Sequence, residues 1–126
     1  MFTPKALSVI LAFFVILQGS KCQSEESQKI LNKIQFDYAA VNDKGMVNND
    51  VAIDYEFCIP MDEDKVAEVR KIEPDVIIPR LAKGRISCSD NEWLCIVSTN
   101  NSKWKEKLYA IASLSYVKRI VQTDYE

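Results

Sequence analysis

The feature that most constrains the fold is an alternating run of nine residues, from Val51 to Ile59. The alternation predicts a strand whose apolar residues share one face: Val51, Ile53, Tyr55, Phe57 and Ile59. The opposite face carries Asp54, Glu56 and Cys58. Pro60 ends the strand, because proline cannot donate to a sheet ladder. One face of this strand must therefore be buried against other elements.

Two helices are predicted after this strand. The first begins at Asp62, a residue type that suits the N-cap, and ends before Pro74, which disfavours helical geometry at the preceding residue. The second begins at Ser102, and Ser115 interrupts it. Both helices carry apolar residues at helical spacing, so each has one face to bury.

The remaining segments favour strands. Residues 84–88 and 93–98 are interpreted as a β-hairpin, and Pro79 keeps the chain just before it at a sheet edge. Residues 116–122 close the chain as a further strand. The order strand, helix, strand, strand, helix, strand predicts an α+β, ferredoxin-like βαββαβ domain over residues 51–126. Its antiparallel sheet would carry both helices on one face.

A lead-in over residues 23–50 precedes this domain. Four of its apolar residues recur at helical spacing and predict an N-terminal amphipathic helix over residues 25–41: Ile30, Ile34, Tyr38 and Val41. We expect this helix to pack on its own domain, and the alternative is a helix that binds a partner. Either the helix or a partner would then cover the polar face of the first strand.

Residues 1–22 are typical of a signal peptide, because Lys5 precedes an uncharged run from Ala6 to Leu17. The run is shorter than the roughly 20 apolar residues that cross a bilayer, so no transmembrane segment is expected in the mature form. Cleavage after Cys22 would release a secreted or periplasmic protein. In the alternative, Cys22 is retained and lipidated, and residues 23–27 tether the domain to a membrane.

Composition excludes several classes of function. Removing Lys5 and Lys21 with the signal reduces the 16 basic residues to 14, against 18 acidic ones, and the resulting net charge of about −4 disfavours nucleic acid as a partner. The chain has no histidine, which removes the commonest general base and most zinc sites. Gly84 has no companion glycines to cradle a phosphate. We therefore expect no metal and no cofactor.

Three cysteines follow the signal, and an exported domain favours disulfides. Cys88 and Cys95 flank the predicted hairpin turn, so we expect them to bond to each other. Cys58 is the alternative partner of Cys95, because the strands that carry them would be neighbours. One cysteine is left over in either case, free or paired outside the chain unless Cys22 is retained. We expect Cys58, if free, to be a buried and unreactive thiol rather than a catalytic one.

Two further patterns are candidates for chemistry. Asn100 opens the tripeptide Asn100-Asn101-Ser102, which is a glycosylation acceptor if the source is eukaryotic. Asp54 and Glu56 lie two apart on one strand face, which keeps a small extracytoplasmic enzyme that uses carboxylates as an alternative. Nothing in the sequence selects them over ordinary exposed charges, so we expect a protein that is not an enzyme.

The closing helix and strand, residues 108–124, resemble the end of subtilisin-type propeptides and their stand-alone inhibitor relatives. The resemblance covers about 17 residues and implies a ferredoxin-like domain with a serine protease as its partner. It also implies an inhibitory tail laid in the protease cleft: Thr123, Asp124, Tyr125 and Glu126. We expect an exported, non-enzymatic binding module with a protein partner, and a protease inhibitor is one form of it.

Overall fold

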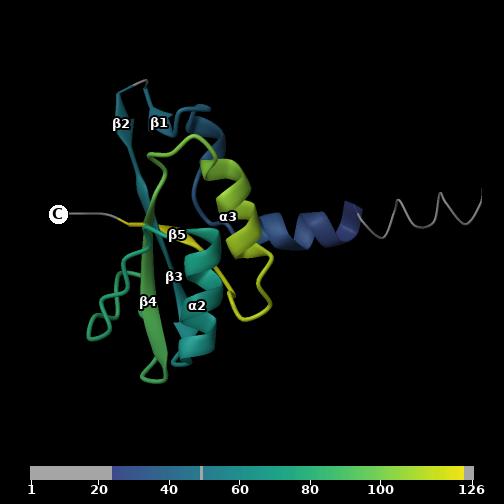
Figure 1. Ribbon diagram of the computed structural model, residues 1–126. Coiled ribbons are helices and arrows are strands. Elements are labelled where there is room, and N and C mark those ends of the chain that lie inside the picture. Colours follow the sequence, from purple (N-terminus) through teal and green to yellow (C-terminus); the bar gives the residue numbers. More distant parts are fainter. Residues whose placement is uncertain (1–23, 49, 124–126) are drawn as a thin grey trace, which may run out of the picture.

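The computed structural model describes residues 24–48 and 50–123, so the predicted signal peptide, Cys22 and the last three residues lie outside the described residues. A helix over residues 24–32 comes first, and the short 3-10 helix η1 (Tyr38–Ala40) follows it. The other elements, in chain order, are β1 (Met46–Val47), β2 (Val51–Ala52), β3 (Asp54–Pro60), α2 (Glu63–Ile72), β4 (Glu92–Ser98), α3 (Trp104–Ala112) and β5 (Val121–Gln122). Figure 1 shows their arrangement.

The main sheet is antiparallel and has the order β4–β3–β5, with β3 in the centre. β3 and β4 pair along their whole length, from Asp54 opposite Ser98 to Pro60 opposite Glu92. β5 adds only two residues on the other side of β3. β1 and β2 form a separate two-stranded sheet. The predicted α+β class is confirmed.

The predicted hairpin over residues 84–98 is wrong in its first half, because residues 84–87 form turns. The amide of Ser87 donates to the carbonyl of Gly84 at 3.2 Å, and that of Cys88 donates to the carbonyl of Lys83 at 2.9 Å. Gly84 and Ser87 have positive φ values of 71° and 62°, which lie outside the extended region that a strand requires. Local turn chemistry therefore replaces the strand.

A four-stranded ferredoxin-like sheet is accordingly not confirmed. The free side of β4 carries one isolated antiparallel bridge, in which Ile77 and Ile96 exchange hydrogen bonds of 2.9 and 2.8 Å. The sheet thus has three strands, with a single bridge where the fourth strand was expected.

The core lies between the sheet and the helices α2 and α3, which cover the same face of the sheet in Figure 1. The predicted apolar face of β3 is confirmed here, since Tyr55, Phe57 and Ile59 are each no more than 1% exposed. The helices contribute Val66, Val69, Trp104, Leu108, Ile111 and Ala112. Val51 departs from the prediction and is exposed, because it belongs to the small β1–β2 sheet.

The helix starts follow two different patterns. The predicted N-cap Asp62 is confirmed, because its Oδ1 accepts a 2.9 Å hydrogen bond from the amide of Asp64. The predicted cap at Ser102 is wrong, since α3 begins at Trp104 and Lys103 stands at the cap position. The side chain of Asn101 accepts from the amide of Lys103 at 3.1 Å and helps to order this start.

The N-terminal helix is shorter than predicted and ends at residue 32 rather than 41. Ile34 forms a parallel bridge with Ile120, which draws the chain out of helical geometry. The Nζ of Lys33 donates to two carbonyls at the end of α3, those of Ala112 and Leu114, at 2.8 and 3.1 Å. These bonds fix the segment on the helical side of the molecule, where Val41 and Ile34 enter the core.

The opposite face of the sheet is covered by the loop over residues 79–91, which projects from that face in Figure 1. We expected the N-terminal helix or a partner to lie there. Instead Ile86 and Cys88, each 4% exposed, pack on Leu94 of β4 and form a second apolar cluster. Glu56 lies beneath this loop and is 1% exposed, although its position in the alternation predicted a side chain facing outward.

Candidate functional site

An apolar groove of about 410 Å³ lies between the N-terminal helix, η1 and α3. Its volume falls in the usual range for sites that hold small molecules, roughly 300 to 1,000 Å³. Its lining consists of Leu31, Ile34, Tyr38, Ala39, Trp104, Lys105, Leu108 and Tyr109. Two stretches far apart in the sequence, residues 31–39 and α3, thus supply one hollow. We call it the helical groove.

The walls of the helical groove are held in place by hydrogen bonds from buried groups. Trp104 is 1% exposed, and its indole Nε1 donates to the carbonyl of Asn42 at 2.8 Å. That bond satisfies the only donor of the indole, which leaves the ring to form apolar wall. On the other wall, the Lys33 bonds to the end of α3 fix the chain beside Ile34. The hollow is therefore bounded by ordered elements.

One cation stands in the lining of the helical groove. The Nζ of Lys105 lies 3.0 Å from Asp43 Oδ1 and 5.6 Å from the centre of the Trp104 ring. Both members of this ion pair are well exposed, so the pair is weak and can exchange with another anion. The Tyr109 hydroxyl, at 3.5 Å from Ser27 Oγ, adds a polar group. The groove can thus accept an apolar body with one acidic end.

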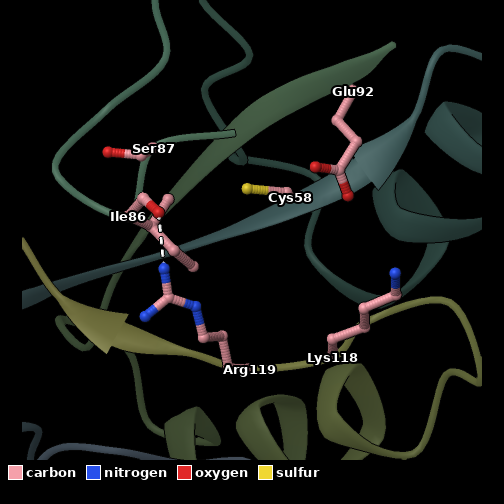
Figure 2. A pocket seen from close by; sticks show the side chains of 6 residues that line it. All are labelled: Cys58, Ile86, Ser87, Glu92, Lys118 and Arg119. Carbon is pink, nitrogen blue, oxygen red and sulfur yellow. Dashed lines mark hydrogen bonds between the residues drawn. The ribbon is translucent and has the colours of Figure 1, made fainter. Parts of the chain in front are cut away.

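A second, smaller cavity of about 120 Å³ lies on the other face of the sheet, beside the loop over residues 79–91. Figure 2 shows Cys58 of β3 in the middle, with Arg119 and Lys118 on one side and Glu92 on another. Ile86 and Ser87 of the loop complete the lining. We call this cavity the disulfide pocket, because Cys58 is bonded to Cys88.

Charges of both signs surround the disulfide pocket. The guanidinium of Arg119 donates to the carbonyl of Ile86 at 2.6 Å. The amide and hydroxyl of Ser89 donate to Glu92 Oε1 at 2.9 and 2.8 Å. The hydrogen bond from the backbone amide of Ser89, together with the positive charge of Lys118, holds the pKa of Glu92 below its usual value. The pocket therefore offers two cations and one ionised carboxylate around a sulfur atom.

The candidate catalytic carboxylates do not share a site. Asp54 lines a hollow of about 120 Å³ together with Glu73 and Asp75. Glu56 does not line it, because its carboxylate is buried under the loop and accepts hydrogen bonds from the amide of Ile86 and the hydroxyl of Thr123. Within residues 24–48 and 50–123, no three acidic or cysteine side chains are grouped so that they could hold a metal ion.

The predicted disulfide between Cys88 and Cys95 is wrong, as is the alternative between Cys58 and Cys95. The structure has a bond between Cys58 and Cys88, whose Cα atoms are 5.6 Å apart. The register decides the pairing: Cys95 lies opposite Phe57 and faces the core, whereas Cys58 lies opposite Leu94 and faces the loop. Among the residues that the structure describes, Cys95 is the free cysteine; it is fully buried, and burial raises its pKa to about 12.

Two other predicted site residues are ordered at the surface. Asn100 is exposed in the loop before α3, and its amide donates to the hydroxyl of Ser98 at 3.1 Å. Thr123 is bonded to β3, because its amide donates to the carbonyl of Asp54 at 2.8 Å and its hydroxyl to Glu56 at 3.0 Å. Asp124, Tyr125 and Glu126 lie outside the described residues.

Sequence reasoning missed the helical groove. Ile34, Tyr38, Trp104 and Leu108 stood out as apolar positions on two predicted helices, but both stripes were interpreted as core. No short-range signal could have found the groove, because the first helix ends where Ile34 pairs with the distant Ile120. The two apolar surfaces then meet without filling the space between them.

Comparisons with known proteins leave the chain without an assigned family. No family model, no curated protein and no solved structure matches it. In the part of the chain that the structure describes, no helix is both long and apolar enough to cross a membrane.

Proposed function

We propose that the protein is a non-enzymatic, extracytoplasmic binding module that holds a small amphipathic molecule in the helical groove. The observation that carries this proposal is the groove itself, a hollow of about 410 Å³ with mainly aliphatic and aromatic walls. Its lining contains no carboxylate, which suits binding better than acid and base chemistry. The disulfide between Cys58 and Cys88 is compatible with an oxidising compartment.

The ligand class follows from the lining. An apolar body gains free energy by leaving water for the accessible side chains of Leu31, Tyr38 and Tyr109, with the buried Trp104 and Leu108 behind them. Lys105 favours an acidic group at the end of that body, because its exposed pair with Asp43 is easily exchanged. We therefore propose an amphipathic molecule with a compact apolar part and one anionic group.

The test uses anilinonaphthalene sulfonate, which combines an aromatic body with one anion. Trp104 lines the groove and Trp93 does not, so a Trp93→Phe variant leaves one reporter of occupancy. We expect saturable binding that changes the fluorescence of Trp104, and competition by a fatty carboxylate such as decanoate. Dye binding that does not saturate, or that leaves the Trp104 emission unchanged, would contradict the proposal.

The chain offers a matched pair of control variants. Ala39 and Ala40 are both exposed residues of η1, and only Ala39 lines the groove. Ala39→Phe should fill the hollow and weaken binding about tenfold or more, a loss of roughly 1.4 kcal/mol or more, whereas Ala40→Phe should leave it unchanged. Lys105→Met should weaken the binding of anionic ligands and leave the binding of a neutral analogue such as decanol unchanged. Equal effects of both alanine substitutions would count against this site.

A second candidate, the propeptide-like inhibitor of serine proteases, is supported by the anchoring of Thr123. Its two hydrogen bonds to β3 form a fixed stem at the sheet, from which a tail of residues 124–126 would enter a protease cleft.

We also propose that the sheet is a reduced ferredoxin-like arrangement. In support, Ile77 meets β4 on the side away from β3, which gives the order β5, β3, β4, Ile77.

This candidate is tested with a panel of serine proteases that includes subtilisin-type enzymes. Truncation after Thr123 removes the proposed tail and keeps the bonds of Thr123 to the sheet, so the fold should remain intact by circular dichroism. We expect inhibition by the full chain and its loss in the truncated one. Absence of inhibition, or inhibition that survives the truncation, eliminates the tail mechanism and leaves the groove proposal untouched.

A further inference from the structure

We propose that Cys58 is a site of reversible modification by small anionic thiols of the glutathione class, and that opening its bond to Cys88 releases the middle of the loop over residues 79–91, around Ile86, from the sheet. The proposal rests on a juxtaposition in the disulfide pocket: Cys58 lines a cavity that Lys118 and Arg119 also line.

Access distinguishes the two sulfur atoms. Cys58 is half-buried and lines the pocket, whereas Cys88 is 4% exposed and is packed under the loop beside Leu94. A small nucleophile therefore meets the Cys58 side of the bond first. Figure 2 shows Cys58 lying between the cationic side of the pocket and the loop.

The charges of the pocket select the nucleophile. The thiolate, not the thiol, attacks a disulfide, and a positive environment raises the local concentration of anions. Lys118 and Arg119 are both exposed side chains that line the pocket, and Glu92 supplies one opposing charge. The guanidinium of Arg119 is held by its hydrogen bond to the carbonyl of Ile86, so Lys118 is the cation that is freer to meet an incoming anion.

The protein disulfide is reduced by thiol–disulfide exchange in two steps. A thiolate attacks the sulfur of Cys58, forms a mixed disulfide with it and displaces Cys88 as a thiolate, which takes up a proton. A second thiolate then attacks the external sulfur, which frees Cys58 and yields the symmetrical disulfide of the small thiol. The small thiol is oxidised and the protein disulfide is reduced.

The ends of the loop stay tied when this bond opens, because Arg80 pairs with Glu63 and the carbonyl of Asn91 accepts from the amide of Met61. The middle of the loop is held to the sheet through Ile86. The amide of Ile86 donates to Glu56 at 2.7 Å, the carbonyl of Ile86 accepts from Arg119, and the Ile86 side chain packs on Leu94. The disulfide is the covalent link between β3 and this part of the loop, so opening it leaves only these noncovalent contacts around Ile86. Release of this segment would expose the carboxylate of Glu56 to water.

Cys95 provides an internal control. It is fully buried in the core, on the face of the sheet opposite to Cys58. Local release of the loop leaves it protected, whereas global unfolding exposes it. Alkylation of each cysteine, located by peptide mass, therefore separates the two events.

The first test measures rate constants for opening of the disulfide in the intact oxidised protein. Each is normalised to thiolate concentration and divided by the rate constant of the same thiol with a small uncharged disulfide, which removes differences in intrinsic nucleophilicity. Mercaptoacetate, mercaptoethanol and cysteamine present anionic, neutral and cationic thiols of similar size. We expect the anionic thiol to react about fivefold faster than the cationic one at low salt. Lys118→Glu should remove that preference, whereas Lys29→Glu, an equal charge change at an exposed position of the N-terminal helix, should preserve it. Rates independent of thiol charge, or equal effects of both substitutions, overturn the proposal.

The second test follows the consequences in the same protein. The mixed disulfide should be found on Cys58, not on Cys88. After full reduction, Cys58 and Cys88 should be alkylated and Cys95 spared, and the amide of Ile86 should exchange at least about tenfold faster while β3 and α3 amides keep their protection. An adduct on Cys88, unchanged exchange at Ile86, or simultaneous alkylation of Cys95 would each refute a local release.

Discussion

The carboxylate of Glu56 accepts a 2.7 Å hydrogen bond from the backbone amide of Ile86, thirty residues further along the chain. Its second oxygen accepts from the hydroxyl of Thr123 at 3.0 Å. One buried side chain of the central strand therefore ties together the loop over residues 79–91 and the end of β5. Ile86 lines the disulfide pocket, so we expect both this pocket and the anchoring of Thr123 to depend on this carboxylate.

Replacement of Glu56 should test that dependence. Glu56→Ala leaves a buried amide and a hydroxyl without an acceptor, so we expect a loss of about 3 kcal/mol in the free energy of unfolding. Glu56→Gln keeps an acceptor for Ile86 and should cost about 1 kcal/mol. Urea denaturation of both variants measures the difference. Two variants of equal stability would mean that the carboxylate is not the link between these segments.

The two glycines with positive φ should differ in their tolerance of a side chain. At Gly45 an added Cβ would lie 1.7 Å from the backbone oxygen of Thr99, and at Gly84 it would lie 2.6 Å from a methyl group of Leu94. A backbone oxygen moves less readily than the end of a side chain. We expect Gly45→Ala to cost about 3 kcal/mol or more and Gly84→Ala about 1 to 2 kcal/mol, by thermal or urea unfolding. The reverse ranking would contradict this interpretation.

Stability should fall at alkaline pH, in part through Cys95. Its thiol has an ordinary pKa of 9.0 when the chain is unfolded, and burial raises the pKa to about 12 in the folded protein. Between these values the folded state keeps a proton that the unfolded state has lost. The contribution to stability is therefore complete below about pH 9 and declines above it, by at most about 1.4 kcal/mol per pH unit. Burial also raises the pKa of Tyr55, which adds to the decline.

Cys95→Ala provides the measurement for that prediction. The variant loses packing at every pH, but its stability should decline less steeply between pH 9 and pH 10 than that of the parent chain. Urea unfolding at both values, with the disulfide intact, gives the two slopes. Identical slopes would show that another group causes the loss of stability at alkaline pH.

The buried Glu73 and the partly exposed Lys107 form an ion pair that can be dissected by a double-mutant cycle. Glu73 is 3% exposed, and its Oε2 has no hydrogen-bond partner although Lys107 Nζ lies 3.6 Å away. Lys107→Met should cost about 1 to 3 kcal/mol, because it leaves the buried charge uncompensated. Glu73→Gln should cost less, and the double variant should recover part of the loss. Additive costs in the cycle would show that the two charges do not interact.

Local patterns predicted the elements that depend on neighbouring residues alone. The strand at Tyr55 to Ile59, the N-cap at Asp62 and the apolar faces of both helices were all correct, since periodicity and capping act within a few residues. The predictions failed where segments distant in sequence compete. Ile34 pairs with Ile120 and stops the first helix, and the turn at Gly84 replaces a strand.

The candidate sites depend even more on distant contacts. The register of β3 against β4 decides that Cys58 and Cys95 face opposite sides of the sheet, and a shift of one residue would reverse the side chains of one strand. Composition could count the cysteines but not assign their partners. The helical groove likewise arises only when the Tyr38 segment and α3 meet at a spacing that their side chains do not fill.

By itself, the sequence determined the α+β class, the central strand with its buried face, and the start of α2, because each follows from residue types at short fixed intervals. The tertiary structure decided which sulfur atoms bond, why Glu56 is buried, and where the groove lies. These outcomes depend on register and on loop closure, in which small differences of free energy between distant contacts select one arrangement among several that the local pattern allows.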